Sequence, residues 1–198
     1  MRFGRALDPI LGSKTKLGLL RTMFSSPGRR WTGREVANAA RISTAQAARD
    51  LAELADTSVV LREVAGKSYS WGLNSAHVLF PTLQELFLRE AGLKAEMVRQ
   101  VADALGSVPV ERARVFGSVA RGDERDDSDV DLFLQIRRPV DRGRIEAAIH
   151  RVRARIWSRF GNPVSALVYT RTEATRPPNP ALMESINREG IDLKEGVE

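Results

Sequence analysis

A segment near the middle of the chain combines a glycine-serine turn with two alternating aspartates. It reads Val-Phe-Gly-Ser-Val-Ala-Arg-Gly over residues 115–122 and Ser-Asp-Val-Asp-Leu-Phe-Leu over residues 128–134. If residues 129 to 134 form a strand, side chains two positions apart point to the same face. The carboxylates of Asp129 and Asp131 then project together, while Val130 and Leu132 face a core. The segment therefore predicts a strand, a turn into a helix, and a second strand that carries two acids on one face.

These residue types suit a phosphate and a metal ion. Two carboxylates on one rigid element are the oxygen ligands that Mg²⁺ commonly takes together with substrate phosphates. Gly117 allows close backbone approach or a positive φ, and we expect Ser118 to cap the following helix and to offer its hydroxyl and amide to a phosphate. The sequence thus predicts a site for magnesium and a phosphate-bearing ligand.

The pattern Gly-Ser-x-Ala-Arg-Gly over residues 117–122, with ten residues between Ser118 and Asp129, resembles the nucleotidyltransferase superfamily related to DNA polymerase beta. The similarity is to its minimal nucleotidyltransferase branch and extends over roughly residues 108 to 195. It implies that Mg²⁺ is held by Asp129 and Asp131, which are also the catalytic residues. The nucleoside triphosphate (NTP) would be bound by Gly117, Ser118, Arg121 and Gly122.

The resemblance also implies a reaction and partners. A hydroxyl of a protein, an RNA or a small molecule would attack the α-phosphate of the NTP, and pyrophosphate would leave. Members of this branch often act beside a helical HEPN partner as toxin-antitoxin pairs, which implies a partner of that kind.

One position departs from the superfamily pattern. A third carboxylate normally comes from a later strand, and here the expected strand, residues 163–169, carries Ser165 at the equivalent position. Loss of a general base typically lowers a rate by about 10²–10⁴. Three interpretations stay open: a weak enzyme, an enzyme that uses an acid from elsewhere or from a partner, or a domain that binds nucleotide without turnover.

The first part of the chain predicts three helices and a hairpin. Residues 14–24 have amphipathic spacing, and capping boxes at Thr32 to Glu35 and at Ser43 to Gln46 begin two short helices. Two β-prone runs, residues 59–64 and 68–73, are joined by a turn that contains Gly66. Three helices followed by a hairpin resemble the winged helix-turn-helix fold.

That resemblance implies a double-stranded DNA partner. The third helix would present Ser43, Thr44, Gln46 and Arg49 to base edges in the major groove, and Lys67 on the hairpin would meet a phosphate. Residues 1–50 hold ten Lys or Arg against three acids, although the whole chain has a net charge of only +6. Asp50, Glu53 and Asp56 make the later part of that helix acidic, so a protein partner is the alternative.

Two further helices are expected. A long apolar helix over residues 81–105 would be a connector or the seam of a homodimer. A basic helix over residues 142–160 would turn Ile145, Ile149, Val152, Ile156 and Trp157 inward. Its arginines form either a solvated face or a grip for an RNA or polyphosphate acceptor.

The sequence predicts a two-domain α/β (α+β) protein. The expected domains are a winged helix-turn-helix domain over residues 1–80, a linking or dimerisation helix over 81–106, and a nucleotidyltransferase-like mixed sheet with flanking helices over 107–198. There is no Cys, which excludes disulfides and cysteine chemistry, and no apolar run reaches the roughly 20 residues of a membrane span. We expect a cytoplasmic protein without a membrane partner. Its function would be nucleoside monophosphate transfer or, alternatively, transcription regulation with a catalytically inactive second domain.

Overall fold

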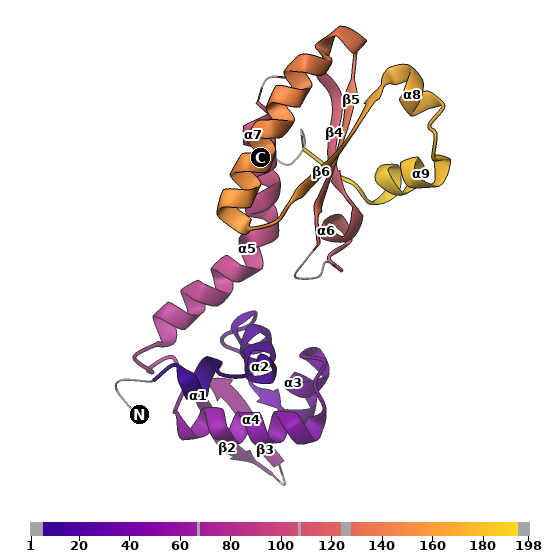
Figure 1. Ribbon diagram of the computed structural model, residues 1–198. Helices are drawn as coiled ribbons and strands as arrows, with labels where there is room; N and C mark the ends of the chain where they lie inside the picture. Colours follow the sequence, from indigo (N-terminus) through magenta and orange to yellow (C-terminus); the bar gives the residue numbers. More distant parts are fainter. Residues whose placement is uncertain (1–5, 67, 107, 124–127, 194–198) are drawn as a thin grey trace. The chain divides into compact units, whose positions relative to one another are not determined.

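The chain forms two compact units, Met1–Ala91 and Gly92–Glu198. The computed structural model describes residues 6–66, 68–106, 108–123 and 128–193. Helix α5 (Phe80–Leu105) begins in the first unit and ends in the second (Figure 1). This helix lies where the sequence predicts one, and its role as a connector or a dimer seam stays a prediction.

The first unit packs helices against a small antiparallel sheet. Its helices are α1 (Asp8–Leu11), α2 (Lys14–Phe24), α3 (Gly33–Ala39) and α4 (Thr44–Asp56), and the start of α5 joins them. The strands are β1 (Trp31–Thr32), β2 (Val60–Ala65) and β3 (Ser68–Leu73), in the order β1-β3-β2. Leucines from α2 and α4 and two tryptophans from the strands fill the core. The predicted helices and hairpin are therefore present.

The two predicted capping boxes differ. Thr32 accepts a hydrogen bond from the Glu35 amide, and the Glu35 carboxylate accepts one from the Thr32 amide at 2.7 Å, so this box is complete. Ser43 accepts from the Gln46 amide at 3.3 Å, but the Gln46 side chain donates to Asp50 Oδ1 at 2.8 Å instead of returning to Ser43. The prediction of a second complete capping box was therefore wrong. The Gln46 amide bonds to Asp50 because the buried Asp50 carboxylate needs a hydrogen-bond donor.

The second unit is a mixed four-stranded sheet in the order β6-β5-β4-β7. Its strands are β4 (Val110–Phe116), β5 (Val130–Ile136), β6 (Val164–Thr170) and β7 (Ile191–Asp192). Strand β4 is antiparallel to β5 and β7, while β5 and β6 are parallel. A parallel pair needs a crossover connection, and η2 (Pro139–Asp141) with α7 (Arg142–Phe160) provides it.

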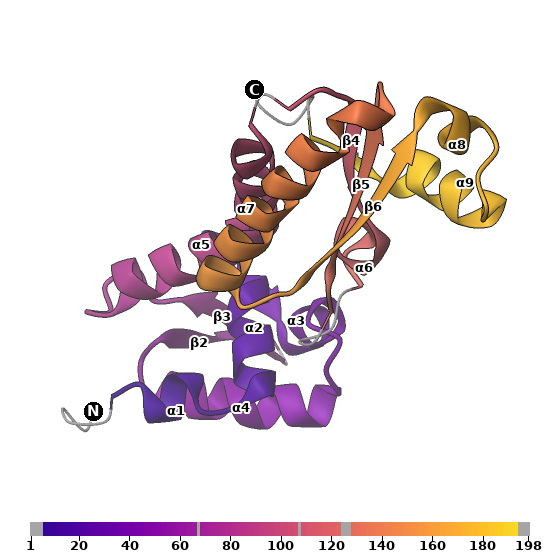
Figure 2. The same cartoon turned by 45° about the horizontal axis from the view of Figure 1, so that its top comes forward.

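The two faces of this sheet bury different cores. Leu132 and Leu134 of β5 pack with α7 and the end of α5 on one face, and Phe133 packs with α9 (Pro180–Glu189) on the other (Figure 2). Short helices α6 (Gly117–Arg121) and α8 (Arg171–Thr175) follow β4 and β6. The mixed α and β architecture agrees with the predicted fold class.

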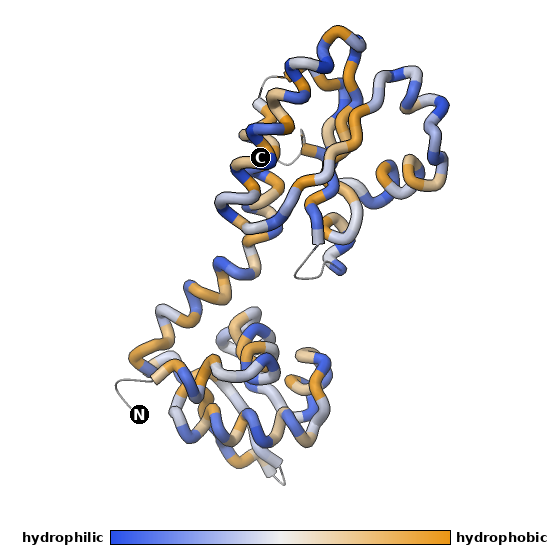
Figure 3. The backbone as a smooth tube through the Cα atoms, in the orientation of Figure 1, coloured by the Kyte–Doolittle hydropathy of each residue, from blue (hydrophilic) through white to orange (hydrophobic). Residues whose placement is uncertain are grey.

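Helix α7 differs from the prediction at one residue. Ile145, Ile149, Val152 and Ile156 are buried as expected, but the Trp157 side chain is 64% exposed. Each residue turns an α-helix by about 100°, so the position after Ile156 points away from the buried face. Hydrophilic residues interrupt the hydrophobic ones along this helix (Figure 3). Among the described residues, the helices are too short or too polar to cross a membrane.

Candidate functional site

The turn after β4 brings Gly117 against Asp131. Phe116 pairs with Asp131 across the antiparallel ladder, and Gly117 then starts α6 with a φ of 73°. A Cβ built on Gly117 would overlap the carboxylate of Asp131. Because only glycine leaves room there and adopts this φ without strain, the packing explains why the motif has glycine at this position.

The two aspartates converge as their spacing predicts. Asp131 lies on β5 and Asp129 immediately precedes that strand. Ser165 of β6 is the parallel register partner of Asp131, and its hydroxyl donates a hydrogen bond to Asp129 Oδ2 at 2.9 Å. A neutral hydroxyl therefore lies beside both acids, at the position where the resemblance calls for a third carboxylate.

The electrostatics of Asp131 are unfavourable for its charged form. Partial burial raises the pKa of the Asp131 carboxyl, the charge of Asp129 raises it further, and the charge of the Arg121 guanidinium opposes both. No ion pair of Asp131 occurs in the described part of the chain. Two like charges therefore lie near each other, and the described residues give neither of them a paired cation.

The donor set suits a single metal ion only if a ligand or water completes it. Among the described residues, no group of three or more His, Cys, Asp or Glu side chains could hold a metal ion. Asp129 and Asp131 offer two hard oxygen ligands, and Mg²⁺ usually takes one or two carboxylates plus phosphate and water oxygens. The residues present thus fit Mg²⁺ that arrives with a phosphate ligand, but not a metal site made by protein alone.

Ser118 lies inside α6 and does not cap it. The N-cap residue is Phe116, whose side chain makes no capping bond, so the predicted capping role of Ser118 was wrong. The physical reason is that the helix begins one residue earlier, at Gly117. The Ser118 carbonyl accepts hydrogen bonds from the amides of Gly122 and Asp123 and so closes the helix at its other end.

The remaining motif residues hold α6 in place. Gly122 ends the helix with a left-handed φ of 77°. Glycine adopts this conformation readily, which explains why the motif has a second glycine at this position. The Arg121 guanidinium pairs with Asp123 at 3.1 Å and with Glu189 of α9 at 3.5 Å. The Lys94 ammonium of α5 donates to the carbonyl of Ala120 at 2.8 Å.

A pocket of about 420 Å³ opens between these elements. It is lined by Phe116, Gly117, Arg121, Asp131, Ser165, Ala166, Leu167, Leu182 and Ser185. One cavity is thus lined by four residues that the sequence pattern singled out: Gly117, Arg121, Asp131 and Ser165. The sequence did not predict that α9 lines this pocket. The apolar spacing of this segment indicates a helix, but it does not indicate which surface the helix packs against.

The predicted DNA-reading residues lie at the start of α4. Ser43, Thr44 and Arg49 are exposed. The Arg49 guanidinium donates to Gln46 Oε1 at 2.6 Å, so these two side chains form one polar group with Asp50. Lys67 lies outside the described residues.

Two arginines that immediately precede β1 are already engaged. Arg29 lies 3.8 Å from the centre of the Trp31 ring and pairs with Glu35. Arg30 pairs with Glu63. The net positive charge of this part of the chain is therefore less available to a polyanion than the composition alone indicates.

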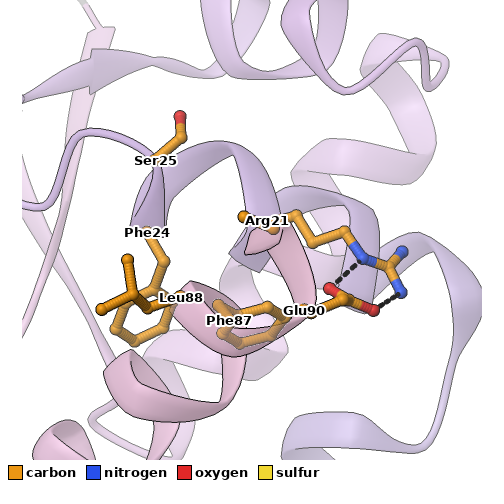
Figure 4. A pocket seen from close by; sticks show the side chains of 7 residues that line it. Arg21, Phe24, Ser25, Phe87, Leu88 and Glu90 are labelled. Atoms are coloured by element: carbon orange, nitrogen blue, oxygen red, sulfur yellow. Dashed lines mark hydrogen bonds and ion pairs between the residues drawn. The ribbon is translucent and has the colours of Figure 1, made fainter. Parts of the chain in front are cut away.

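The first unit has a pocket of its own, of about 650 Å³ (Figure 4). The stacked rings of Phe24 and Phe87, 5.0 Å apart, form its apolar wall with Leu88. At its edge, the Arg21 guanidinium donates two hydrogen bonds to the Glu90 carboxylate, at 2.6 and 2.7 Å. Its charged groups are therefore paired with each other.

One comparison with known proteins, the family match, bears on the second unit. Residues 96–190 match the sequence model of a family described as nucleotidyltransferase domain. A solved structure, a possible transcriptional regulator from Methanosarcina mazei Go1, matches at 10% identity, with 48% of this chain and 84% of that chain covered and a TM-score of 0.33. A search of curated proteins gave no match. The family match supports a nucleotidyltransferase domain in the C-terminal part of the chain.

Proposed function

We propose that the second unit binds an NTP together with Mg²⁺ in the pocket beside Gly117. The observation that carries this proposal is the convergence of Asp129 and Asp131 against a glycine turn that no other residue fits. Among the described residues, neither acid has a paired cation. Nucleotidyltransferase domains generally use Mg²⁺, and the family match covers these residues. A bound cation would relieve the repulsion between the two carboxylates.

Each residue has a distinct part in this proposal. Asp129 and Asp131 hold Mg²⁺, which supplies positive charge next to the phosphates when it is bound. The backbone at Gly117 and Ser118 approaches the triphosphate, because there is no side chain at 117 to keep it away. Arg121 pairs with phosphate oxygens once it leaves Asp123 and Glu189, and Gly122 fixes the end of α6 that carries it.

The reaction would be nucleoside monophosphate transfer. An oxygen of an acceptor hydroxyl forms a bond to the α-phosphorus, the bond to the bridging oxygen breaks, and pyrophosphate leaves. The hydroxyl proton needs an acceptor, and Ser165 is not basic enough to provide one. We therefore expect slow transfer by this chain, to a hydroxyl of a protein, an RNA or a small molecule.

A regulator without catalysis is the second candidate, and the hydrogen bond from Ser165 to Asp129 favours it. In this function the first unit is a winged helix-turn-helix domain that binds double-stranded DNA, and the second unit senses an NTP. The arrangement of α2, α3, α4 and the β2-β3 hairpin supports it. A helical HEPN-like partner of the toxin-antitoxin kind would suit either candidate.

Label transfer separates the two candidates. The protein is incubated with Mg²⁺ and NTPs labelled at the α-phosphate, and modified protein, RNA and small molecules are resolved. For an enzyme we expect slow labelling that Asp129→Asn abolishes and that Ser165→Asp increases by about 10²-fold, because a carboxylate is restored next to Asp129. Ser75→Asp, at an exposed site of the first unit, is the matched control. If no label is transferred by either the wild type or Ser165→Asp, the enzyme candidate is excluded.

Operator binding tests the first unit. A gel shift on the promoter of the protein's own gene should weaken as salt rises, because phosphate contacts release counterions. Arg49→Ala should lower the affinity by about tenfold, whereas Arg89→Ala, an exposed arginine on α5, should leave it unchanged. Equal affinity of the wild type and Arg49→Ala would contradict the placement of α4 in the groove.

A further inference from the structure

Helix α7 concentrates positive charge on its exposed side. Its 19 residues contain six arginines and a single glutamate. All six are exposed, while the opposite side of the helix fills the core under the sheet. They are Arg142, Arg144, Arg151, Arg153, Arg155 and Arg159. No step of the proposed function uses this surface.

The same side of α7 exposes an indole ring. Trp157 is 64% exposed, whereas Trp31 and Trp71 of the first unit are only 6% exposed. A single exposed aromatic side chain is common at protein surfaces. Its position within a dense group of arginines is the feature that calls for a ligand.

Helical geometry separates the exposed side into two edges and a track. At about 100° per residue, Arg144, Arg151 and Arg155 line one edge. Trp157 lies on the other edge, with Arg153 one turn before it. The track between the edges contains four small exposed residues, Gly143, Ala147, Ala154 and Ser158, and the exposed His150 next to the Trp157 edge. An extended chain could lie along this track with one side against cations and the other against a ring.

The arginines on the first edge are available to an anion. In the described part of the chain, the guanidinium of neither Arg144 nor Arg155 forms an ion pair or donates a hydrogen bond. Arg151 makes only long hydrogen bonds, at 3.4 and 3.5 Å, to carbonyls at the end of α5. These groups can therefore bind phosphates without breaking a short bond.

We propose that α7 binds single-stranded nucleic acid, with phosphates on the edge formed by Arg144, Arg151 and Arg155 and a base stacked on Trp157. Single strands present both a regular row of charges and free base faces, and they bind to grooves that combine cations with aromatic rings. A duplex keeps its base faces stacked inside. An anionic membrane needs several apolar side chains on the helix, and this side of α7 has one large one. The inference goes beyond nucleotide binding at Gly117 and does not depend on it.

The intrinsic fluorescence of the full chain tests the stacking. A 20-nucleotide thymidine oligomer and a uridine oligomer of the same length are titrated separately, so that DNA and RNA are distinguished. We expect quenching, because Trp157 is accessible whereas both other tryptophans are buried. Trp157→Phe should abolish the quenching, and Trp157→Ala should weaken binding, followed by anisotropy of a labelled oligomer, by about five- to a hundredfold.

The salt dependence of binding tests the phosphate contacts. Arg144→Ala/Arg155→Ala should reduce the slope of the logarithm of affinity against that of salt by about 1.4, since each contact on a single strand contributes about 0.7. The matched control is Arg171→Ala/Arg176→Ala, which removes the same charge from exposed sites of the same unit. Asp129→Asn/Asp131→Asn should bind the oligomers as the wild type does, even if it no longer binds nucleotide.

Four results would overturn the proposal. They are the absence of binding, quenching that persists in Trp157→Phe, an equal loss of slope in the control double variant, and equally tight binding of a duplex or of anionic phospholipid vesicles. Binding of either oligomer with the expected variant effects supports it.

Discussion

The two units each contain a pocket with acidic residues, and the pockets treat negative charge in opposite ways. In the first unit, the hydrogen bond from Arg21 lowers the pKa of the Glu90 carboxyl, and the attraction between their charges adds to it. In the second unit, burial and the neighbouring charge of Asp129 raise the pKa of Asp131. A paired charge supports the folded state, whereas a partly buried charge with no paired cation among the described residues opposes it. A carboxyl with a raised pKa is typical of functional sites. We therefore assign the proposed function to the second pocket.

The largest effect should come from ligand binding at the second pocket. Mg²⁺ and NTP at about 100 times the Kd should raise the free energy of unfolding by about 2.7 kcal/mol, because the ligand binds only the folded state. Asp129→Asn/Asp131→Asn should lose this stabilisation, whereas Glu90→Gln should keep it. Thermal denaturation with and without Mg²⁺-NTP measures both. If Mg²⁺-NTP stabilised both variants equally, the ligand would not depend on the acids of the second pocket.

Gly117→Ala should destabilise the second unit by about 1–3 kcal/mol in the absence of ligand. The added Cβ meets the Asp131 carboxylate, and the backbone has a positive φ. Urea denaturation measures the change. Gly143→Ala is the control, because a Cβ there meets nothing within 4 Å and the residue is helical. A neutral effect of Gly117→Ala would show that the turn is not constrained by Asp131.

Glu90→Gln should destabilise the first unit by only about 0.5 kcal/mol near neutral pH, because both partners of the pair are partly exposed to solvent. The lowered pKa of Glu90 fixes the direction of the pH dependence: the stabilisation is present above the ordinary glutamate pKa and is lost as pH falls through the folded pKa. Urea denaturation of the wild type and the variant at several pH values measures this. A difference that grew at acidic pH would contradict the pairing.

The smallest effect is expected for Asp131→Asn without metal or nucleotide. The raised pKa means that ionisation of Asp131 costs stability as pH rises from the ordinary aspartate value through the folded value. The variant should therefore be slightly more stable than the wild type at neutral pH, and the two should converge at pH values below both pKa values. Thermal denaturation in a chelator checks the sign. A less stable variant at neutral pH would mean that the Asp131 charge is compensated.

Local sequence patterns predicted most of the secondary structure. The boundaries of α2 are those of the periodic segment, and the complete capping box of Thr32 and Glu35 lies at the start of α3. The alternation of Asp129 and Asp131 predicted two acids on one face, because the strand period is fixed by the backbone. Patterns with more than one possible partner were less reliable. Gln46 bonds to Asp50 and not to Ser43, and Trp157 lies outside the core that its apolar character favoured.

The sequence by itself determined the helices, the strands and the glycine turn with its two acids, since these depend on residues within a few positions of each other. Only the tertiary structure brought Ser165 onto Asp129, closed Gly117 against Asp131 and placed α9 over the pocket. Those contacts join residues at least 14 positions apart, and the pairing register of the strands decides which of them meet. The raised pKa of Asp131 also arises at this level, because burial and neighbouring charges exist only once the sheet has formed.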